Sequence, residues 1–305
     1  MARVLAADIG GTNCRLALFE DGQLVDRERL PTSGPSFAAA TAPWLAGRGL
    51  DAAGVAVAGP VRSGRAALTN HPWAFDESSL ARALGAPTVL LNDFAAAVRG
   101  VPELRAGSWH HLAGPLPDRK ATLVAVGPGT GLGQAALVAT SHGWLTLPSE
   151  AGHMDLAPGT HEDLDLWRTL AGLHGHVSWE RVLSGPGLLA LYAARSASDA
   201  DAPTLDQPAH VTASALPAAR AAVDDFARLL GAFAGNAALS MLPSGGVWLC
   251  GGIVPRILDR LDSTIRAFHA KGRLSETVQR VPLCAVVDDD LGLRGAAAAA
   301  RSALS

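Results

Sequence analysis

Short apolar runs separated by tight turns open the chain and predict three strands. Val4 to Asp8 and Arg15 to Phe19 have strand-like patterns, with Gly10-Gly11 between them. Asp21-Gly22 is typical of a hairpin turn and predicts a third strand after it. The first thirty residues therefore predict strand, turn, strand, turn, strand.

The same pattern begins again after Pro102. Thr122 to Val126 predicts a strand, a glycine-rich turn follows at Gly127 to Gly133, and Ala135 to Ala139 with Trp144 to Leu147 predicts a hairpin. Because helical segments follow both patterns, we expect two related α/β lobes. Small ligands commonly bind between lobes, so a cleft there is the expected ligand site.

Turn residues and periodicity predict the remaining elements. Val55 to Ala58 and Ala66 to Thr69 flank Ser63-Gly64 and predict another hairpin. The segment 195–216 is rich in Ala, Asp, Ser and Pro, which predicts a surface excursion. The later elements are helices at Pro217 to Met241, Pro255 to Ala270 and Leu291 to Leu304, and strands at Val247 to Cys250 and Val281 to Val287.

Composition limits the class of protein. The 305 residues are 49% hydrophobic and 17% charged, which supplies a buried core and argues against disorder. A formal net charge of −3 gives no electrostatic footprint for nucleic acid or an anionic membrane. Cys14, Cys250 and Cys284 lie far apart in apolar runs without CxxC spacing, and predict buried reduced thiols. Without a signal-peptide pattern or a charge-free apolar span, the chain is predicted to be cytoplasmic.

Two glycine turns have the composition of phosphate-binding loops: Asp8-Ile9-Gly10-Gly11-Thr12-Asn13 and Gly127 to Gly133. Glycine lets several backbone N–H groups approach a phosphate, threonine adds a donor, and Asp8 can hold Mg²⁺ or its water. An ordinary glycine hairpin is the alternative for either turn alone. The spacing does not fit a dinucleotide-binding motif, and no Gly-Lys-Ser/Thr of a Walker loop occurs. A third pair, Gly251-Gly252, suits either close approach of a ring or ribose, or ordinary packing.

Polar residues suited to sugar recognition occur at three places. Thr88 to Leu91 predicts a strand that ends at Asn92-Asp93, where a helix begins. Glu150, His153 and Glu180 lie in later loops. Phosphoryl transfer needs a carboxylate that takes the proton of the attacking hydroxyl, a role that suits Asp93. A plain helix N-cap for Asp93, and a surface pair for Glu150 and His153, are the alternatives.

Together these motifs resemble those of the bacterial glucokinases in the hexokinase and actin-like ATPase superfamily, over nearly the whole chain. The resemblance implies an α/β, two-lobed actin-like ATPase (ribonuclease H-like) fold with the active site in the interlobe cleft. We expect the small lobe at residues 1–103, with the C-terminal helix 291–305 returning to it, and the large lobe at 104–290. The further landmarks are Thr69-Asn70-His71-Pro72-Trp73, Leu91-Asn92-Asp93-Phe94, Glu150-Ala151-Gly152-His153, Glu180 to Gly187 and Gly251 to Arg256.

The resemblance also implies roles. The reaction would be transfer of phosphate from ATP to the 6-hydroxyl of glucose, with Asp93 as general base and a homodimer as the assembly. The residues that would bind glucose are Asn92, Asp93, Glu150, His153 and Glu180. Those that would bind ATP are Asp8, Gly10, Gly11, Thr12, Asn13, Gly129, Thr130, Gly131, Gly251 and Gly252. Asp8 would hold Mg²⁺ through water, and Gly251-Gly252 would face the adenosine.

Two residues depart from the family pattern. Ala151 stands where the family usually has glycine, and Pro128 stands where alanine is frequent. A methyl group at Ala151 could change selectivity among glucose, mannose and glucosamine. The main alternative is a kinase of another hexose such as mannose, fructose or glucosamine, or one that uses polyphosphate as donor. A non-catalytic sugar sensor is disfavoured, because Asp93, Asp8 and both glycine turns are present.

Overall fold

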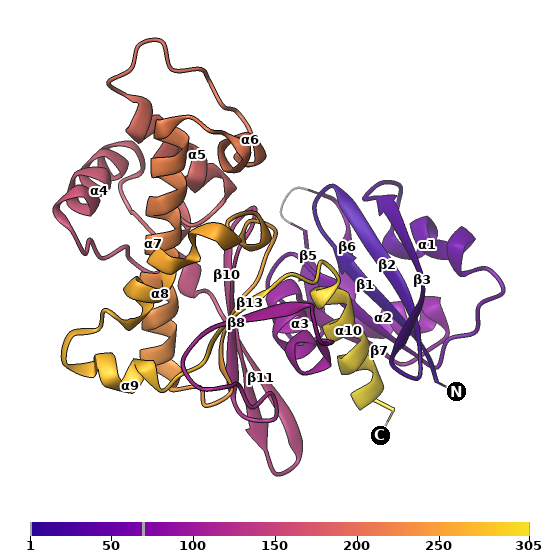
Figure 1. The fold of residues 1–305 in the computed structure, drawn as a ribbon. Helices are drawn as coiled ribbons and strands as arrows, with labels where there is room; N and C mark the ends of the chain where they lie inside the picture. The colour runs from indigo at the N-terminus through magenta and orange to yellow at the C-terminus, as the bar shows by residue number, and fades with distance from the viewer. Residues whose placement is uncertain (1, 69–70, 305) are drawn as a thin grey trace. The chain divides into compact units, whose positions relative to one another are not determined.

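The computed structural model describes residues 2–68 and 71–304. The chain divides into two compact units (Figure 1). The first contains the chain up to Ala106, Thr146–Pro148 and the residues from Asp288 onward, and the second contains Gly107–Leu145 and Ser149–Val287. Within the described residues, no helix combines the length and the apolar character needed to cross a membrane.

The first unit is built on a five-stranded sheet. β1, β4 and β7 are parallel, so their carboxyl ends meet at one edge, whereas β2 and β3 continue the sheet antiparallel. In spatial order the strands are β3 (Gln23–Pro31), β2 (Asn13–Glu20), β1 (Arg3–Ile9), β4 (Ala52–Val57) and β7 (Thr88–Asn92). The other elements are α1 (Phe37–Leu45), a ribbon of β5 (Arg65–Ala67) and β6 (Ala74–Asp76), α2 (Glu77–Leu84), α3 (Asp93–Gly100), the 3-10 helix η1 (Val101–Glu103) and α10 (Leu291–Ser302).

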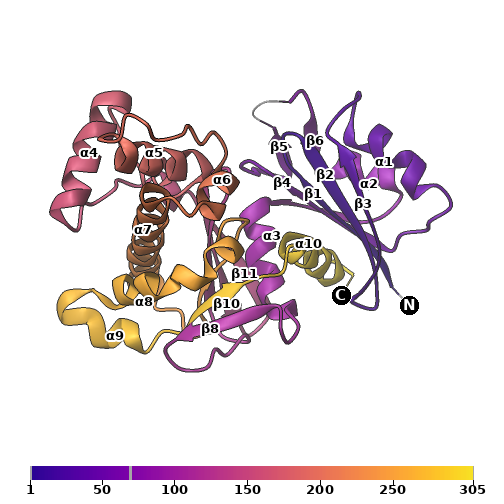
Figure 2. The ribbon, with the colours of Figure 1, turned by 45° about the horizontal axis from the view of Figure 1, so that its top comes forward.

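Small residues let α10 pack directly on α3 and on the sheet (Figure 2). A Cβ atom on Gly295 of α10 would lie 1.7 Å from the carbonyl oxygen of Ala96 in α3. A Cβ atom on Gly54 of β4 would lie 2.0 Å from the carbonyl oxygen of Ala296. Backbone therefore packs on backbone, which fixes the helix whose first residue is Asp93.

The second unit is built on a six-stranded sheet. Its order is β11 (Gly143–Ser149), β10 (Leu132–Thr140), β9 (Leu123–Pro128), β12 (Gly246–Leu249), β13 (Leu283–Val286) and β8 (Trp109–Ala113). When its strands are numbered in chain order from β9, leaving out β8, the second sheet has the spatial order third, second, first, fourth, fifth. The strands of the first sheet, numbered from β1, have the same order. The repeated order confirms the prediction of two related α/β units.

Helices of the second unit pack around the 25-residue helix α7 (Pro217–Met241). The bounds of α7 agree with those predicted from the sequence. The other helices are α4 (His161–His174), α5 (Gly185–Ser196), α6 (Pro208–Ala213), α8 (Leu261–His269) and α9 (Ser275–Gln279). The 3-10 helices are η2 (Ala151–His153), η3 (Trp179–Arg181), η4 (Val254–Arg256), η5 (Leu258–Arg260) and η6 (Gly272–Leu274).

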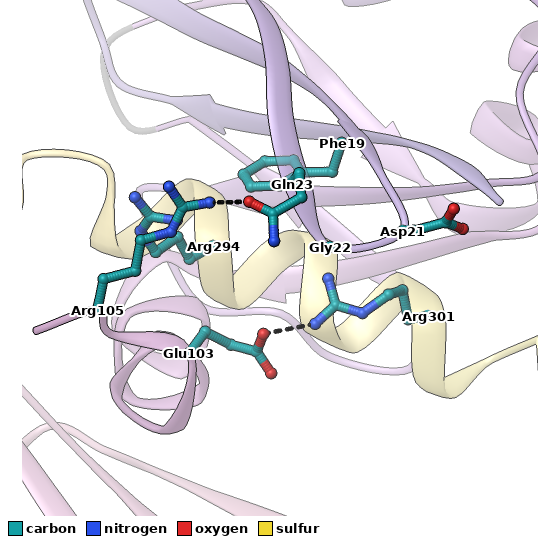
Figure 3. Close-up of a pocket in the computed structure, with 8 residues that line it drawn as sticks. All are labelled: Phe19, Asp21, Gly22, Gln23, Glu103, Arg105, Arg294 and Arg301. Atoms are coloured by element: carbon teal, nitrogen blue, oxygen red, sulfur yellow. Dashed lines mark hydrogen bonds and ion pairs between the residues drawn. The ribbon is translucent and has the colours of Figure 1, made fainter. Parts of the chain in front are cut away.

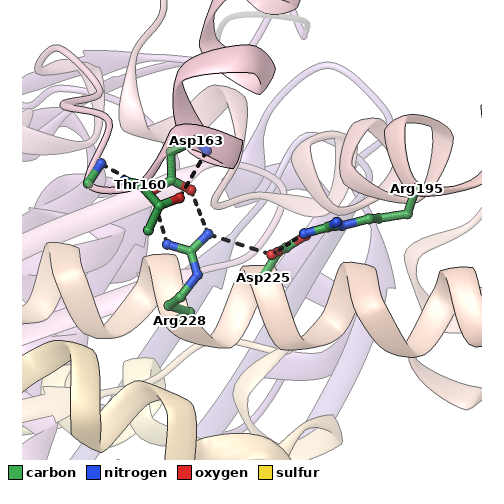
Figure 4. Close-up of polar contacts among 6 residues, drawn as sticks. Thr160, Asp163, Arg195, Asp225 and Arg228 are labelled. Carbon is green, nitrogen blue, oxygen red and sulfur yellow. Dashed lines mark hydrogen bonds and ion pairs between the residues drawn. The ribbon is translucent and has the colours of Figure 1, made fainter.

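An ion-pair network joins α4 and α5 to α7 (Figure 4). The carboxylate of Asp163, which is 2% exposed, accepts hydrogen bonds from the backbone N–H of Thr160 at 3.1 Å and from Arg228 at 2.5 and 3.0 Å. Asp225 accepts hydrogen bonds from Arg195 at 2.6 and 2.8 Å. Pairing of this kind offsets the cost of burying the Asp163 charge.

The predicted hairpin of Val55 to Ala58 with Ala66 to Thr69 is wrong. β4 pairs in parallel with β1 and β7, and β5 pairs with β6. Turn residues indicate where the chain bends, but they do not identify a partner strand that is distant in sequence. Thr69 and Asn70, part of a predicted landmark, lie outside the described residues.

Two other predictions need correction. The helix expected over Pro255 to Ala270 is interrupted, because Ile257 has φ −123° and ψ 19°, and the regular helix begins only at Leu261. The segment 195–216 is not wholly a surface excursion, since α6 forms within it and Val211 is fully buried.

Candidate active site

Asp8, Asn92 and Asp93 lie at the carboxyl edge of the first sheet. Asp8 is the penultimate residue of β1, and Asn92 ends β7. In the parallel register, Ile9 is opposite Val57 and Val57 is opposite Asn92. Ligands of open α/β sheets bind outside the carboxyl ends of the strands, so this edge is a candidate site.

The side chain of Asn92 caps helix α3. Its Oδ1 accepts hydrogen bonds from the backbone N–H groups of Phe94 and Ala95 at 2.9 and 3.1 Å. Its Nδ2 donates to the carbonyl oxygen of Gly59 at 3.1 Å and to Asp93 Oδ1 at 2.9 Å. These four hydrogen bonds use the whole capacity of an amide. Asn92 is therefore the N-cap, which removes that alternative for Asp93.

Asp93 has an unusually high pKa for an aspartate. Burial, and to a smaller extent the negative charge of Asp8, raises the pKa of Asp93 to about 6. Hydrogen bonds from Phe94 and Asn92 act in the opposite direction and lower it. A carboxylate with this pKa is mostly ionised at neutral pH and is more basic than an ordinary aspartate. These are the properties that a general base requires.

Arg15 contacts Asp8 and was missed by the sequence analysis. Its Nη2 donates to Asp8 Oδ2, and its Nη1 donates to the carbonyl oxygen of Asp289 at 2.6 Å. The two side chains belong to residues that are directly opposite in the β1–β2 register. Counting outward from the turn at Gly10-Gly11 would have placed Arg15 opposite Asp8.

The first glycine turn is open. The N–H of Gly10 donates to the carbonyl oxygen of Asn13 at 2.9 Å, and the carbonyl oxygen of Thr12 accepts from Thr32 at 2.9 Å. A Cβ atom on Gly11 would meet no atom within 4 Å, and both Gly11 and Thr12 are exposed. A phosphate could therefore approach the backbone of this turn.

The second glycine turn is tied to its neighbours. The N–H of Gly129 donates to the carbonyl oxygen of Gly131 at 2.8 Å, and the carbonyl oxygen of Gly129 accepts from Gly185 at 2.8 Å. A Cβ atom on Gly131 would lie 2.5 Å from Glu180 Oε2, although one on Gly129 would meet nothing within 4 Å. Thr130, between them, is exposed. A side chain at 131 would therefore displace the carboxylate of Glu180.

The predicted sugar residues of the second unit gather beside this turn. The N–H of Leu132 donates to Glu180 Oε2 at 2.9 Å, and His153 Nδ1 lies 4.0 Å from Glu180 Oε1. A Cβ atom on Gly152 would lie 2.0 Å from the carbonyl oxygen of Leu132, so η2 packs directly on the same residue. The exposed Glu150 precedes η2, and its carbonyl oxygen accepts from the N–H of His153 at 2.9 Å.

Gly251 and Gly252 follow β12, which is parallel to β9. Gly251 has φ +89°, and a Cβ atom there would lie 2.4 Å from the carbonyl oxygen of Pro128. Gly252 has no atom within 4 Å of its Cβ position. The carboxyl edge of the second sheet thus brings this pair beside the second glycine turn.

Comparison with known proteins identifies the family. The sequence model of the glucokinase family, described as Glucokinase, matches residues 5–303. The chain belongs to the glucokinase family. Glucokinases of Marinobacter nauticus and Klebsiella pneumoniae subsp. pneumoniae are each 38% identical to it. The alignments cover 97% of this chain and 96% of the first relative, and 98% and 97% for the second.

Solved glucokinase structures have the same fold. A glucokinase from an Antarctic psychrotroph has a TM-score of 0.86 at 33% identity, with 99% of each chain covered. A ROK family glucokinase from Streptomyces griseus, solved with glucose and AMPPNP, has a TM-score of 0.71 at 22% identity, with 99% of this chain and 100% of that chain covered. The predicted actin-like ATPase fold class is confirmed. As a glucokinase family member, the chain catalyses ATP-dependent phosphorylation of glucose, which sets aside the sugar-sensor alternative.

Proposed function

We propose that Asp93 is the general base of this reaction. Asp93 takes the proton from the 6-hydroxyl of glucose while that oxygen bonds to the γ-phosphorus of ATP and the bond from that phosphorus to ADP breaks. The products are glucose 6-phosphate and ADP. The observation that carries the assignment is that Asp93, a carboxylate at the carboxyl edge of parallel strands, has a pKa raised to about 6.

Glucose binding is assigned to Asn92, Glu150, His153 and Glu180 besides Asp93. Glu150, His153 and Glu180 hold hydroxyl groups by accepting and donating hydrogen bonds. The side chain of Asn92 already makes four hydrogen bonds, so a sugar hydroxyl would have to replace one of them. Its larger contribution is to cap α3 and to orient Asp93.

The two glycine turns fit the phosphates of ATP. The open backbone at Gly10 to Asn13 and the exposed Thr130 between Gly129 and Gly131 offer N–H and hydroxyl donors, and Gly251-Gly252 leave room beside the adenosine. Across residues 2–68 and 71–304, no three His, Cys, Asp or Glu side chains are grouped as a metal site. Mg²⁺ usually binds one or two carboxylates, water and substrate phosphates. Asp8 would hold the ion through water, and the ion would neutralise phosphate charge.

The assembly and location are part of the proposal. The family resemblance supports a homodimer that acts in the cytoplasm. Light scattering should then give twice the 31.2 kDa mass of one chain, and a mass of one chain would contradict the dimer.

Release of ADP tests the reaction and Asp93 together. With Mg-ATP, glucose should stimulate ADP release far more than mannose, fructose or glucosamine, and polyphosphate should not replace ATP. Asp93→Asn should retain glucose binding but lower kcat by about 10²–10⁴, the usual contribution of a general base. The matched control is Asp262→Asn, which changes an exposed carboxylate in the first turn of α8. Near-normal turnover of Asp93→Asn would remove Asp93 from the role, and stronger release with another sugar would change the substrate.

A further inference from the structure

Three arginine side chains line a pocket of the first unit that none of the proposed catalytic residues enters (Figure 3). The pocket lies between the β2–β3 hairpin, the chain after η1 and helix α10, and its volume is about 380 Å³. That volume is within the range of small-molecule sites. Its arginines are Arg105, Arg294 and Arg301.

The guanidinium groups are held in place by neighbouring side chains. Arg294 and Arg301 are seven residues apart on α10 and therefore share one face of the helix. Arg294 is only 12% exposed, and its Nε donates to Asp288 at 2.7 Å. Arg301 donates to Glu103 at 2.7 Å, and Arg105 donates to the amide oxygen of Gln23. Ordered donors of this kind need little rearrangement when a ligand binds.

Positive charge exceeds negative charge among the lining side chains. Glu103 and Asp21 are the two lining carboxylates, against three guanidinium groups. The Oδ1 of Asp21 accepts a hydrogen bond from the N–H of Ala2 at 3.1 Å. Figure 3 shows the Asp21 side chain pointing away from Gln23 and Arg105. Asp288, outside the lining, pairs with Arg294 and balances this excess, so the pocket attracts an anion through its guanidinium N–H donors and not through net charge.

We propose that this pocket binds a small phosphorylated molecule. Guanidinium groups recognise phosphate oxygens through paired, charge-assisted hydrogen bonds. The side chains of Gln23 and Glu103 supply oxygen atoms that can accept hydrogen bonds from hydroxyl groups of the same ligand. Phosphate is the chemistry shared by two sources, inorganic phosphate and the sugar phosphate that the reaction produces.

A ligand in this pocket contacts the helix pair that supports Asp93. Arg294 and Arg301 belong to α10, and Arg105 follows η1, which continues directly from α3. A Cβ atom on Gly100 of α3 would lie 2.2 Å from the carbonyl oxygen of Leu291 in α10, so the two helices are in backbone contact. Binding should therefore raise the melting temperature of the native protein as ligand concentration increases.

Isothermal titration of the full chain tests the proposal. The ligands are inorganic phosphate, glucose 6-phosphate and, as the neutral probe, glucose. The double variant Arg105→Gln with Arg301→Gln should weaken phosphate binding at least about tenfold. Arg82→Gln, an exposed arginine of α2 in the same unit, is the matched control and should bind phosphate like the native protein. Since the varied residues lie outside the proposed catalytic set, glucose binding should be unchanged in both variants.

The comparison of ligands identifies the source of the phosphate. Glucose 6-phosphate also binds the active site as product, so only binding that the double variant loses is assigned to the pocket. Pocket binding of glucose 6-phosphate at least about tenfold tighter than that of phosphate would assign a sugar phosphate, and equal affinities would assign the phosphate group itself. Should the glutamine variant not fold, Arg105→Lys with Arg301→Lys keeps both charges, and its phosphate affinity should lie below that of the native protein. No binding to the native protein, or equal affinities of the native and varied proteins, would overturn the proposal.

Discussion

The two glycine turns occupy equivalent places in two sheets of the same strand order, but their surroundings differ. The first is open at Gly11 and lies near charged groups, where Asp8 contacts Arg15. Burial, and to a smaller extent the charge of Asp8, raises the pKa of Asp93 there. The second is bounded by backbone and by the carboxylate of Glu180. Motifs that look alike in sequence can therefore be constrained in different ways. We expect the first to respond to changes of charge and the second to added volume.

The largest expected effect is that of Gly251→Ala, beside the second turn. The new methyl group would lie 2.4 Å from the carbonyl oxygen of Pro128, at a residue with φ +89°. Overpacking and left-handed backbone strain together should lower the free energy of unfolding by about 2–4 kcal/mol, measured by urea denaturation. Gly252→Ala is the matched control, because its methyl group would meet no atom within 4 Å. Equal losses in the two variants would show that volume is not the constraint.

A smaller effect is expected from Gly131→Ala. The methyl group would lie 2.5 Å from Glu180 Oε2, so the carboxylate must move and lose its hydrogen bond from Leu132. If Glu180 binds glucose as proposed, glucose affinity should fall by about tenfold, the value of 1.4 kcal/mol. Titration of tryptophan fluorescence with glucose can measure it, since Trp179 adjoins Glu180.

Gly129→Ala provides the comparison for that experiment. Its methyl group would have open space, so glucose affinity should match that of the native protein. Native affinity in Gly131→Ala would instead mean that Glu180 can move at no cost to sugar binding, which would weaken its assignment.

Local patterns predicted the turns correctly, whereas contacts between distant segments needed the structure. The hairpin at Asp21-Gly22 was correct because its strands are adjacent in sequence. The partners of β4 were wrong because parallel pairing joins segments separated by other elements. The hydrogen bond between Leu132 and Glu180 spans 48 residues, and no spacing rule indicates it.

The candidate site shows the same division. The place of Asp93 between a strand and a helix, and then the family resemblance, singled it out, but neither showed that Asn92 is the cap or that burial raises the pKa of Asp93. Those properties depend on three-dimensional surroundings. Arg15 is the intermediate case, because strand register alone would have placed it opposite Asp8.

The smallest expected effect tests the charges near the first turn. In the native protein, kcat should decrease as pH falls through about 6, because protonated Asp93 cannot accept a proton. Arg15→Gln removes the cation that contacts Asp8, so the negative charge of Asp8 should raise the pKa of Asp93 further. The decrease should then begin at a higher pH, displaced by less than about one unit, with the plateau near pH 8 retained.

Arg27→Gln is the control for this measurement. Arg27 is also on the first sheet, is 73% exposed, and pairs at 3.7 Å with Asp290. Its removal changes net charge equally without changing the direct contact to Asp8, so the pH profile of kcat should match that of the native protein. The same displacement in both variants would mean that overall charge, and not the Asp8–Arg15 contact, governs Asp93. An unchanged profile for Arg15→Gln would separate Asp93 from the charges of the first turn and leave burial as the cause of its raised pKa.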